Sequence, residues 1–258
     1  MSKKRILITG GPTNEYIDEV MKITNMSSGK ISIQMAQLFA KNNYRVTLML
    51  TKTIKYEPQS ALIDVVRFET TQELYEAILH ASRMNTYDAV IHSAAVADYK
   101  PEYSFRMEDM AQEIADWIDE NRNVMEVYHP DDLYNIIFDI LTNPQCKVND
   151  STKISSVESN LTVKLGLTPK IIASLREWFP NSLICGFKLL ENVTEDELIG
   201  AATNQIEKCH TDLVFANDLA KLRRGEMTRL VVGPDGVCNI AQNGAEDIVR
   251  VVLQKLNH

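Results

Sequence analysis

Glycines that could hold a phosphate come directly after an apolar run at residues 5–9. Gly10 and Gly11 occupy that place, and glycine lets a backbone approach a phosphate more closely than any other residue does. The same pair also fits a plain turn between a strand and a helix, and these residues alone leave both interpretations open. The surrounding sequence is neither G-x-G-x-x-G nor a Walker loop, so neither nucleotide fingerprint is met.

Anion donors gather a little further along, just before a predicted helix. The segment comprises Asn25, Ser27, Ser28, Gly29 and Lys30. A helix N-terminus adds free N–H groups and a partial positive charge, so this segment suits a phosphate or phosphodiester. The alternative is that Ser28 only caps the helix. The density of donors favours anion binding, with the Asn25 amide available to a carbonyl or carboxylate.

Two further segments each contain a charged residue that could contact a ligand. Small residues at 93–97 follow an apolar run and end at Asp98, whose carboxylate can bind a ribose hydroxyl or a metal, or simply cap a turn. Lys153 lies in the polar stretch 150–156. A lysine there can stabilise charge that develops on a polyphosphate, although an exposed surface lysine is the default interpretation.

The elements that would position these segments alternate along the chain. Apolar runs at 5–9, 45–51, 65–68 and 88–93 predict strands, and helical patterns follow Ser28 and an apparent capping box at 70–73. This alternation predicts an α/β fold with a doubly wound, mainly parallel Rossmann-like sheet. Ligands bind beyond the carboxyl ends of such strands, where residues 10–29 and 93–98 lie.

The alternation is interrupted and then resumes. Residues 102–139 carry eleven acidic and two basic residues, with helical patterns at 107–117 and 133–141. We therefore expect a single α/β domain at 1–258 with an acidic helical insertion at 101–149. After this region the sequence predicts strands at 161–165, 183–187 and 212–216. Helices start at 168–170 and at a second capping box, 194–197. A hairpin around 234–236 and a terminal helix at 247–256 complete the pattern.

Composition excludes several classes of protein. Hydrophobic residues make up 45% of the chain, enough for a full core, and the net charge of −8 argues against nucleic acid or an acidic membrane as partner. No stretch approaches the roughly 18 apolar residues that span a bilayer. The five histidines and four cysteines lack metal-ligand spacing, so no protein-held metal is predicted. We expect a cytoplasmic protein.

The ordered set of motifs resembles the phosphopantothenate–cysteine ligases, in the stand-alone form. The motifs are ITGGPT at 8–13, ID at 17–18, ITNMSSGK at 23–30, AAVADY at 94–99, KISS at 153–156, TPKII at 168–172, GFK at 186–188 and AND at 216–218. Each piece is weak by itself, but together they span roughly residues 5–255 apart from the acidic insertion.

The resemblance implies an amide-forming reaction of coenzyme A synthesis between 4'-phosphopantothenate and L-cysteine. It implies CTP as co-substrate through an acyl-cytidylate, with ATP as the alternative, Mg²⁺ carried by the nucleotide, and a homodimer. Asn25 and Lys153 would be catalytic. Nucleotide contacts would come from Gly10, Gly11, His92, Ser93, Ala94, Asp98, Lys153, Pro169, Lys170, Ile171, Ile172, Phe187 and Lys208. Phosphopantothenate or its phosphate would meet Lys22, Asn25, Ser27, Ser28, Gly29 and Lys30.

The chain departs from the family pattern at three basic positions. Met21 stands where the family usually has arginine, and Gln205 and Cys209 stand where the bacterial fused enzymes have nucleotide-binding lysines. Lys22 and Lys208 are the neighbouring replacements. Two other hypotheses remain: a nicotinamide-dependent reductase, which the missing G-x-G-x-x-G disfavours, and a non-catalytic subunit, which the altered positions allow.

Overall fold

The structure is a computed structural model that describes residues 4–123, 129–148, 154, 159–226 and 228–257. The chain divides into two compact units. The first comprises Met1–Asn14, Thr24–Asp98 and Pro169–His258, and the second comprises Glu15–Ile23 and Tyr99–Thr168. The single domain at 1–258 with its insertion at 101–149 stays a prediction.

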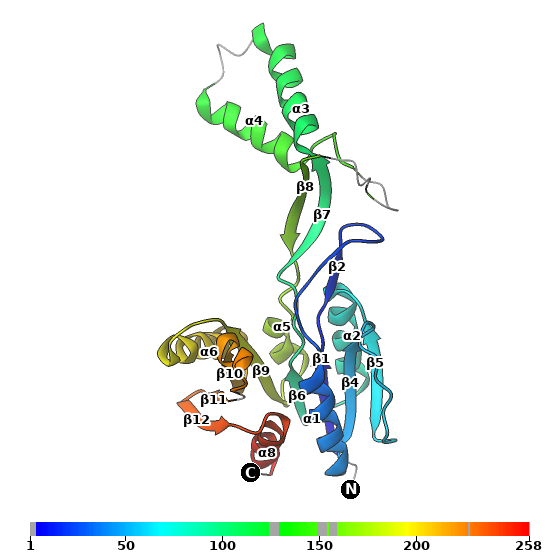
Figure 1. Cartoon of the computed structure of the whole chain (residues 1–258), viewed down its shortest axis with the longest axis vertical. Coiled ribbons are helices and arrows are strands. Elements are labelled where there is room, and N and C mark those ends of the chain that lie inside the picture. The colour runs from blue at the N-terminus through cyan, green and yellow to red at the C-terminus, as the bar shows by residue number, and fades with distance from the viewer. Residues whose placement is uncertain (1–3, 124–128, 149–153, 155–158, 227, 258) are drawn as a thin grey trace. The chain divides into compact units, whose positions relative to one another are not determined.

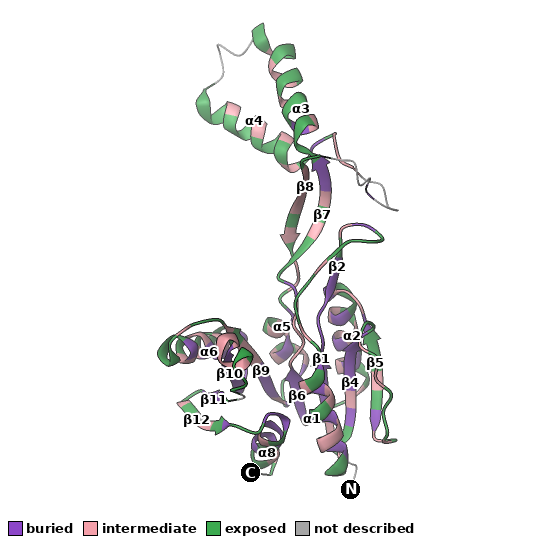
Figure 2. Ribbon diagram, in the orientation of Figure 1, coloured by how far each residue is buried: buried purple, intermediate pink, exposed green. Residues whose placement is uncertain are grey.

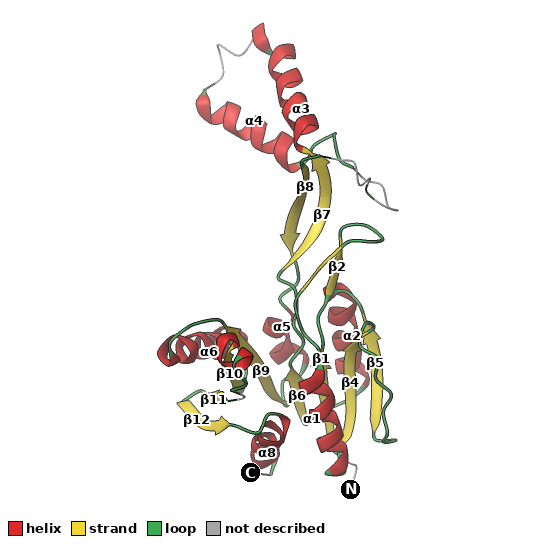
Figure 3. Ribbon diagram, viewed as in Figure 1, coloured by secondary structure: helices red, strands yellow, loops and turns green. Residues whose placement is uncertain are grey.

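A mixed sheet forms the centre of the first unit (Figures 1 and 3). Its strands are β1 (Arg5–Gly10), β4 (Arg45–Thr51), β5 (Ile63–Phe68), β6 (Ala89–His92), β9 (Leu183–Leu190), β10 (Leu213–Asp218), β11 (Arg229–Gly233) and β12 (Gly236–Ala241). Their order is β12-β11-β10-β9-β6-β1-β4-β5. The six strands from β10 to β5 run parallel, and β11 and β12 add an antiparallel hairpin.

Helices cover both faces of this sheet. They are α1 (Lys30–Lys41), α2 (Thr71–Met84), α5 (Ile171–Trp178), α6 (Glu195–Cys209), α7 (Leu219–Arg223) and α8 (Ala245–Leu256). Successive side chains of a strand point to opposite faces. Ile6 and Ile8 therefore join the core that holds α1 and α8, whereas Leu7 joins the core that holds α2 and α5. Burial along nearly all of β1 (Figure 2) explains its continuous apolar sequence. The doubly wound, mainly parallel α/β fold with a C-terminal hairpin is confirmed.

The second unit is built on a long antiparallel ladder. Strands β7 (Tyr99–Arg106) and β8 (Leu161–Leu167) pair from Tyr99 against Leu167 to Arg106 against Leu161. Helices α3 (Met107–Glu120) and α4 (Pro130–Thr142) follow β7 and contact each other. They confirm the acidic helical insertion. A two-stranded sheet, β2 (Asn14–Tyr16) with β3 (Lys22–Thr24), contributes its turn to this unit.

Two local predictions at helix starts need correction. The hydroxyl of Thr70 caps α2 by accepting from the Glu73 amide at 3.1 Å, but the Glu73 carboxylate accepts from Glu69 N–H at 2.8 Å, so the capping box is incomplete. The second box, at the start of α6, is complete. Helix α5 begins at Ile171 with Lys170 as N-cap, so Pro169 precedes the helix and is not its early residue.

Candidate functional site

The segments that follow β1 and β6 lie against each other at the carboxyl edge of the sheet. Ala95 N–H donates to the Gly11 carbonyl at 2.9 Å, and Thr13 N–H donates back to the Ala95 carbonyl at 3.3 Å. The Thr13 hydroxyl also accepts from Ala97 N–H at 2.9 Å. Because β1 and β6 are parallel neighbours, their carboxyl ends meet, as the doubly wound fold predicted.

Gly10 is required by the close approach of β1 to α1. A Cβ atom at residue 10 would lie 1.8 Å from Ser32 Oγ and 2.3 Å from Ser32 Cβ. Gly11 and Gly29 both have positive φ angles, 82° and 64°, which favour glycine. The three glycines thus bring the first turn of α1 to the end of β1.

The N-terminus of α1 keeps amide groups available for a ligand. Gly29 is the N-cap, and no side chain in the described part of the chain caps it. Ser28 Oγ reaches Lys30 N–H only at 3.4 Å, and Ser27 Oγ reaches Gly29 N–H at the same distance. Capping by Ser28, the alternative interpretation, is therefore weak. Free N–H groups with two hydroxyls and Lys30 alongside make an arrangement that can hold a phosphate.

Asn25 ties this loop to the segment after β6. Its Nδ2 donates to the Val96 carbonyl at 2.9 Å, while the Thr24 hydroxyl donates to the Thr13 carbonyl at 2.9 Å. The Asn25 carboxamide oxygen accepts no hydrogen bond from the described residues. Nδ2 also donates to the Ala95 carbonyl at 3.5 Å. Asn25 is exposed, so its carboxamide oxygen can meet a ligand.

His92 is a buried neutral histidine at the end of β6. Its Nδ1 lies 2.9 Å from Thr9 Oγ1, and that oxygen accepts from Ala94 N–H at 3.2 Å. The Thr9 hydroxyl can donate to Nδ1 or accept from it while it accepts from Ala94 N–H, so this pair is compatible with either neutral tautomer of the ring. Burial, helped by the charge of Lys170, lowers the pKa of His92 to about 4. At neutral pH the ring offers an N–H donor and no charge.

Lysine side chains gather beside α5, β9 and α6. Lys170 Nζ pairs with Asp98 at 2.9 Å, and both side chains are more than 60% exposed (68% and 64%), so a ligand can replace the partner at little cost. Burial raises the pKa of the Cys209 thiol, and the charges of Lys170, Lys188 and Lys208 act against that rise. Three cations near one thiol form a field that attracts a polyanion. Lys188 belongs to the GFK motif at 186–188, but the sequence analysis predicted no role for it.

The apolar residues predicted to contact a nucleotide belong partly to the core. Ile171 is 1% exposed and packs in the core with α2, and Ile172 packs against the same core. The Phe187 ring lies 5.2 Å from that of Phe215. The Pro169 carbonyl accepts a hydrogen bond from Ile171 N–H at 3.0 Å. Their contacts with a nucleotide stay predictions.

Gln205 supplies a buried hydrogen-bond donor. The sequence marked this residue only as a position where the bacterial fused enzymes have a lysine. Its Nε2 is buried and has no hydrogen-bond partner among the described residues. A Cβ atom on Gly186 would lie 2.2 Å from that nitrogen and 2.9 Å from Ile172 Cδ1. Gly186 in turn pairs with His92 in the sheet. A buried amide without an acceptor is costly, so a ligand or water that accepts from it would be favoured.

Two predicted residues belong to the second unit. Lys22 lies on β3 with Nζ 5.6 Å from the centre of the Tyr16 ring. Lys153 lies outside the described residues. The first unit by itself brings together the segments after β1 and β6, the start of α1, and the lysines beside α5 and α6.

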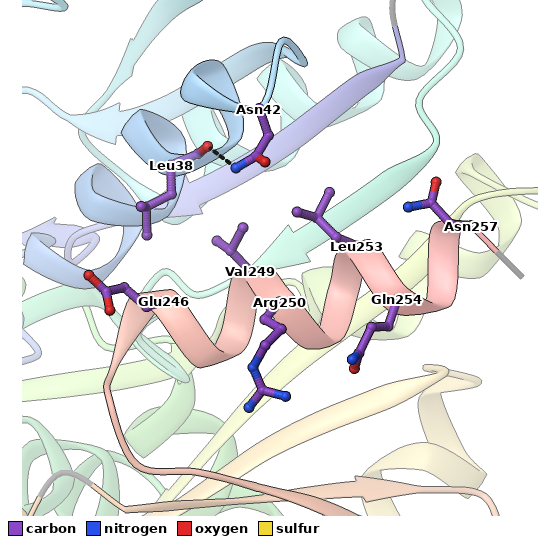
Figure 4. A pocket seen from close by; sticks show the side chains of 8 residues that line it. All are labelled: Leu38, Asn42, Glu246, Val249, Arg250, Leu253, Gln254 and Asn257. Atoms are coloured by element: carbon purple, nitrogen blue, oxygen red, sulfur yellow. Dashed lines mark hydrogen bonds between the residues drawn. The ribbon is translucent and has the colours of Figure 1, made fainter.

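A separate hollow of about 480 Å³ lies between α1 and α8 (Figure 4). It is lined by Leu38, Asn42, Glu246, Val249, Arg250, Leu253, Gln254 and Asn257. None of these is a predicted site residue. Within the described ranges no cluster of three histidine, cysteine or acidic residues could hold a metal, and no helix could cross a membrane.

Comparisons with known proteins found relatives of this chain. Residues 1–119 match the model of the DNA/pantothenate metabolism flavoprotein C-terminal domain. The coenzyme A biosynthesis bifunctional protein CoaBC of Thermococcus kodakarensis is 32% identical over 234 residues, which cover 90% of this chain and 45% of that protein. CoaBC of Methanocaldococcus jannaschii is 28% identical over 223 residues, covering 84% and 41%. The chain therefore spans less than half the length of these relatives.

Solved structures share the fold over nearly the whole chain. The DNA/pantothenate metabolism flavoprotein from Streptococcus pneumoniae superposes with a TM-score of 0.78 at 28% identity, covering 99% of both chains. A Cab2 mutant in complex with phosphopantothenate-cysteine has a TM-score of 0.65 at 18% identity, covering 98% of this chain and 86% of that one. The match of residues 1–119 to this family model and the similarity of the relatives confirm the chain's resemblance to the phosphopantothenate–cysteine ligases.

Proposed function

We propose that the chain joins 4'-phosphopantothenate to L-cysteine in coenzyme A synthesis, using a nucleoside triphosphate. The observation that carries the proposal is the meeting of Gly11, Asn25 and Ala95 through hydrogen bonds at one edge of the sheet. These residues come from three separate motifs of the ligase resemblance. The names of the relatives and the product bound to Cab2 support the same reaction.

The chemistry requires activation of a carboxylate. The phosphopantothenate carboxylate attacks the α-phosphate of the triphosphate, forming an acyl-nucleotide and releasing pyrophosphate. The cysteine amine then attacks the acyl carbon, the amide forms, and the nucleoside monophosphate departs. In both steps a nucleophile attacks a bound electrophile and negative charge develops on the reacting groups. The protein therefore contributes mainly by positioning the substrates and stabilising that charge.

The described residues fit these roles. The start of α1 would hold a phosphate, and Asn25 would hold the acyl-nucleotide through its free carboxamide oxygen. His92 Nε2 would form a hydrogen bond with the nucleotide and Gln205 Nε2 would donate to it, while Lys170, Lys188 and Lys208 would attract its phosphates. By resemblance, Lys153, which lies outside the described residues, would stabilise charge on the triphosphate. Mg²⁺ would arrive with the triphosphate and neutralise part of its charge.

CTP is the preferred co-substrate in this proposal, with ATP as the alternative. By resemblance we also propose a homodimer in the cytoplasm. Multiple-turnover pyrophosphate release, measured with CTP, ATP, GTP and UTP in turn, tests the activity and the base preference together. Release should depend on phosphopantothenate and cysteine. No release with any triphosphate would refute the ligase, whereas faster release with ATP would refute only the choice of CTP.

Replacing Asn25 by aspartate tests its role at the site. Asn25→Asp places a carboxylate oxygen against the Val96 carbonyl, which now accepts from Nδ2 at 2.9 Å, and adds charge beside an anionic intermediate. We expect turnover to fall at least about 10-fold, with acyl-nucleotide accumulating in quenched reactions. Asn42→Asp is the matched control, because Asn42 Nδ2 also donates to a backbone carbonyl, that of Leu38, at 2.9 Å. Equal rates in both variants would remove Asn25 from the mechanism.

A further inference from the structure

A hydrogen-bond donor without an acceptor lies between α6 and the sheet of the first unit. Gln205 belongs to α6, and its Nε2 is buried with no hydrogen-bond partner among the described residues. The amide fills the space beside Gly186, because a Cβ atom there would lie 2.2 Å from Nε2 and 2.9 Å from Ile172 Cδ1. Leaving a buried donor without an acceptor is unfavourable, so a ligand atom that accepts from this amide would be favoured.

His92 lies beside the same position, at the carboxyl end of the neighbouring strand. Strands β6 and β9 are parallel, and His92 pairs with Gly186. Two residues earlier on each strand, Val90 and Ile184 belong to the core that holds α2 and α5. Because side chains alternate along a strand, His92 and position 186 face that same side of the sheet. The imidazole and the Gln205 amide therefore flank one position at the end of the sheet.

Neither of these two polar groups carries a charge. Gln205 is neutral, and burial, helped by the charge of Lys170, lowers the pKa of His92 to about 4. A phosphate desolvated against two neutral groups would lack a compensating charge. Three lysines instead act by charge on Cys209, one turn further along α6, where phosphates would be attracted. The neutral pair suits a flat, uncharged group that carries a hydrogen-bond acceptor, as a nucleobase does.

We propose that Gln205 is a specificity-determining residue for the base of the nucleoside triphosphate, to which Nε2 donates at a ring nitrogen or a ring carbonyl. Gly186 leaves the space that the amide occupies, and the Ile172 side chain adds an apolar contact beside it. The inference rests on the proposed function and deepens it, because it names the part of the nucleotide that meets the buried amide. Cytosine and adenine both carry acceptors of this kind.

Binding of triphosphates with and without a base tests this assignment. CTP and ATP carry a base, whereas ribose 5-triphosphate lacks the base and keeps every phosphate. Gln205→Met removes the donor at nearly constant side-chain length. In calorimetric titrations we expect Gln205→Met to raise the Kd of the tighter of CTP and ATP at least about 10-fold, and that of ribose 5-triphosphate less than about 2-fold. An equal change for both ligands, or no change for either, would overturn the proposal.

Asn204→Leu is the matched control for these titrations. Asn204 is the exposed neighbour of Gln205 on α6, and its substitution also removes an amide. Both Kd values should stay within about 2-fold of those of the wild-type chain. A loss of base-dependent binding equal to that of Gln205→Met would show that any change in this turn of α6 disturbs the site, and would contradict the role of Gln205.

Thermal unfolding without nucleotide separates a ligand contact from a structural role. Because Gln205→Met removes a buried donor that has no acceptor, its Tm should equal that of the wild-type chain or exceed it by a few degrees. A fall in Tm of more than about 4 °C would show that the amide holds the fold, and the proposal would fail.

Gly186→Ala tests where the amide lies. Its methyl group would displace Nε2, so the Kd of CTP should rise at least about 10-fold. In a Gln205→Ala background the displaced atom is absent, and Ile172 Cδ1 is the end of a flexible side chain, so Gly186→Ala should change this Kd less than about 2-fold. Equal losses in both backgrounds would refute the placement of the amide.

The wild-type chain distinguishes this inference from the proposed function. A chain that binds CTP but forms no product would refute the ligase, and the binding results would still decide the role of Gln205. A chain that makes product while Gln205→Met binds CTP as tightly as wild type would refute only the role of Gln205. A wild-type chain that binds neither CTP nor ATP would overturn the inference.

Discussion

The contact between Gly10 and Ser32 makes a strong prediction about the stability of the site's framework. A Gly10→Ala side chain would place carbon 2.3 Å from Ser32 Cβ and 1.8 Å from Ser32 Oγ. Carbon atoms normally pack at about 3.5–4.0 Å, so β1 and α1 would have to separate by more than about 1 Å. Both elements are held in the core by buried neighbours, which resists that movement.

The expected loss follows from overpacking in a rigid core. Such changes cost about 1–3 kcal/mol, and the depth of this overlap places Gly10→Ala at the upper end, about 3 kcal/mol. For a chain of this size that corresponds to a fall in Tm of about 6–12 °C. Thermal and urea unfolding followed by circular dichroism would measure both quantities.

A second substitution should reverse the loss. Ser32→Gly removes both overlapping atoms, after which the nearest neighbour of the new methyl group is Leu50 Cδ1 at 3.5 Å, an ordinary contact. Ser32→Gly alone should cost about 1–2 kcal/mol, because it places a glycine within a helix and removes the buried hydrogen bond from the Ser32 hydroxyl to the Gly29 carbonyl at 2.6 Å. Gly10→Ala should then add almost nothing. Gly200→Ala is the control: nothing lies within 4 Å of its new methyl group, and alanine in α6 should stabilise by about 0.5–1 kcal/mol.

These results could refute the reasoning in two ways. A Gly10→Ala chain whose unfolding free energy lies within about 0.5 kcal/mol of wild type would show that the two elements part easily. The same loss in the Ser32→Gly background would show that another contact excludes the methyl group.

Two further predictions concern His92 and the cap of α6. The folded state lowers the pKa of His92 to about 4 from 6.5, so below pH 6.5 the unfolded chain binds the extra proton, and stability should fall by up to about 3 kcal/mol between pH 6.5 and pH 4. His92→Asn, which keeps an acceptor for Thr9, should lose this part of the pH dependence in urea unfolding; an unchanged profile would assign it to other groups. Thr194→Ala should cost about 1 kcal/mol, because the Thr194 hydroxyl accepts from Glu197 N–H at 3.3 Å and the Glu197 carboxylate accepts from Thr194 N–H at 2.8 Å. Equal unfolding free energies for Thr194→Ala and wild type would show that the cap contributes nothing.

Strands buried on both faces were predictable from local sequence, and strands paired across long loops were not. The apolar run that became β1 is typical of a strand buried on both faces in the middle of a sheet. Strand β7 contains Pro101 and several charged residues, and it exists because β8, more than 50 residues later, pairs with it. The register shifts between Pro101 and Tyr103, where a proline is tolerated.

Local sequence also left side-chain partners undecided. The pattern at 70–73 matches a capping box as well as the pattern at 194–197 does. In the structure the Glu73 carboxylate turns to Glu69 N–H, because the chain before α2 presents that amide. The difference depends on the conformation of the residues that precede each helix, α2 and α6.

By itself the sequence determined the strands β1 and β6 and the small-residue segments that follow them, where we expect a ligand, because apolar strands ending in small residues leave the backbone open at a sheet edge. Tertiary structure decided which segments meet. Sheet order places β9 beside β6, which brings Gly186 next to His92 and, through α6, adds the unpaired amide of Gln205. It also gathers Lys188 with Lys170 and Lys208 around Cys209, and connects Asp18 to Ile154. These contacts join residues far apart in the chain, and only packing, which no local pattern encodes, brings them together.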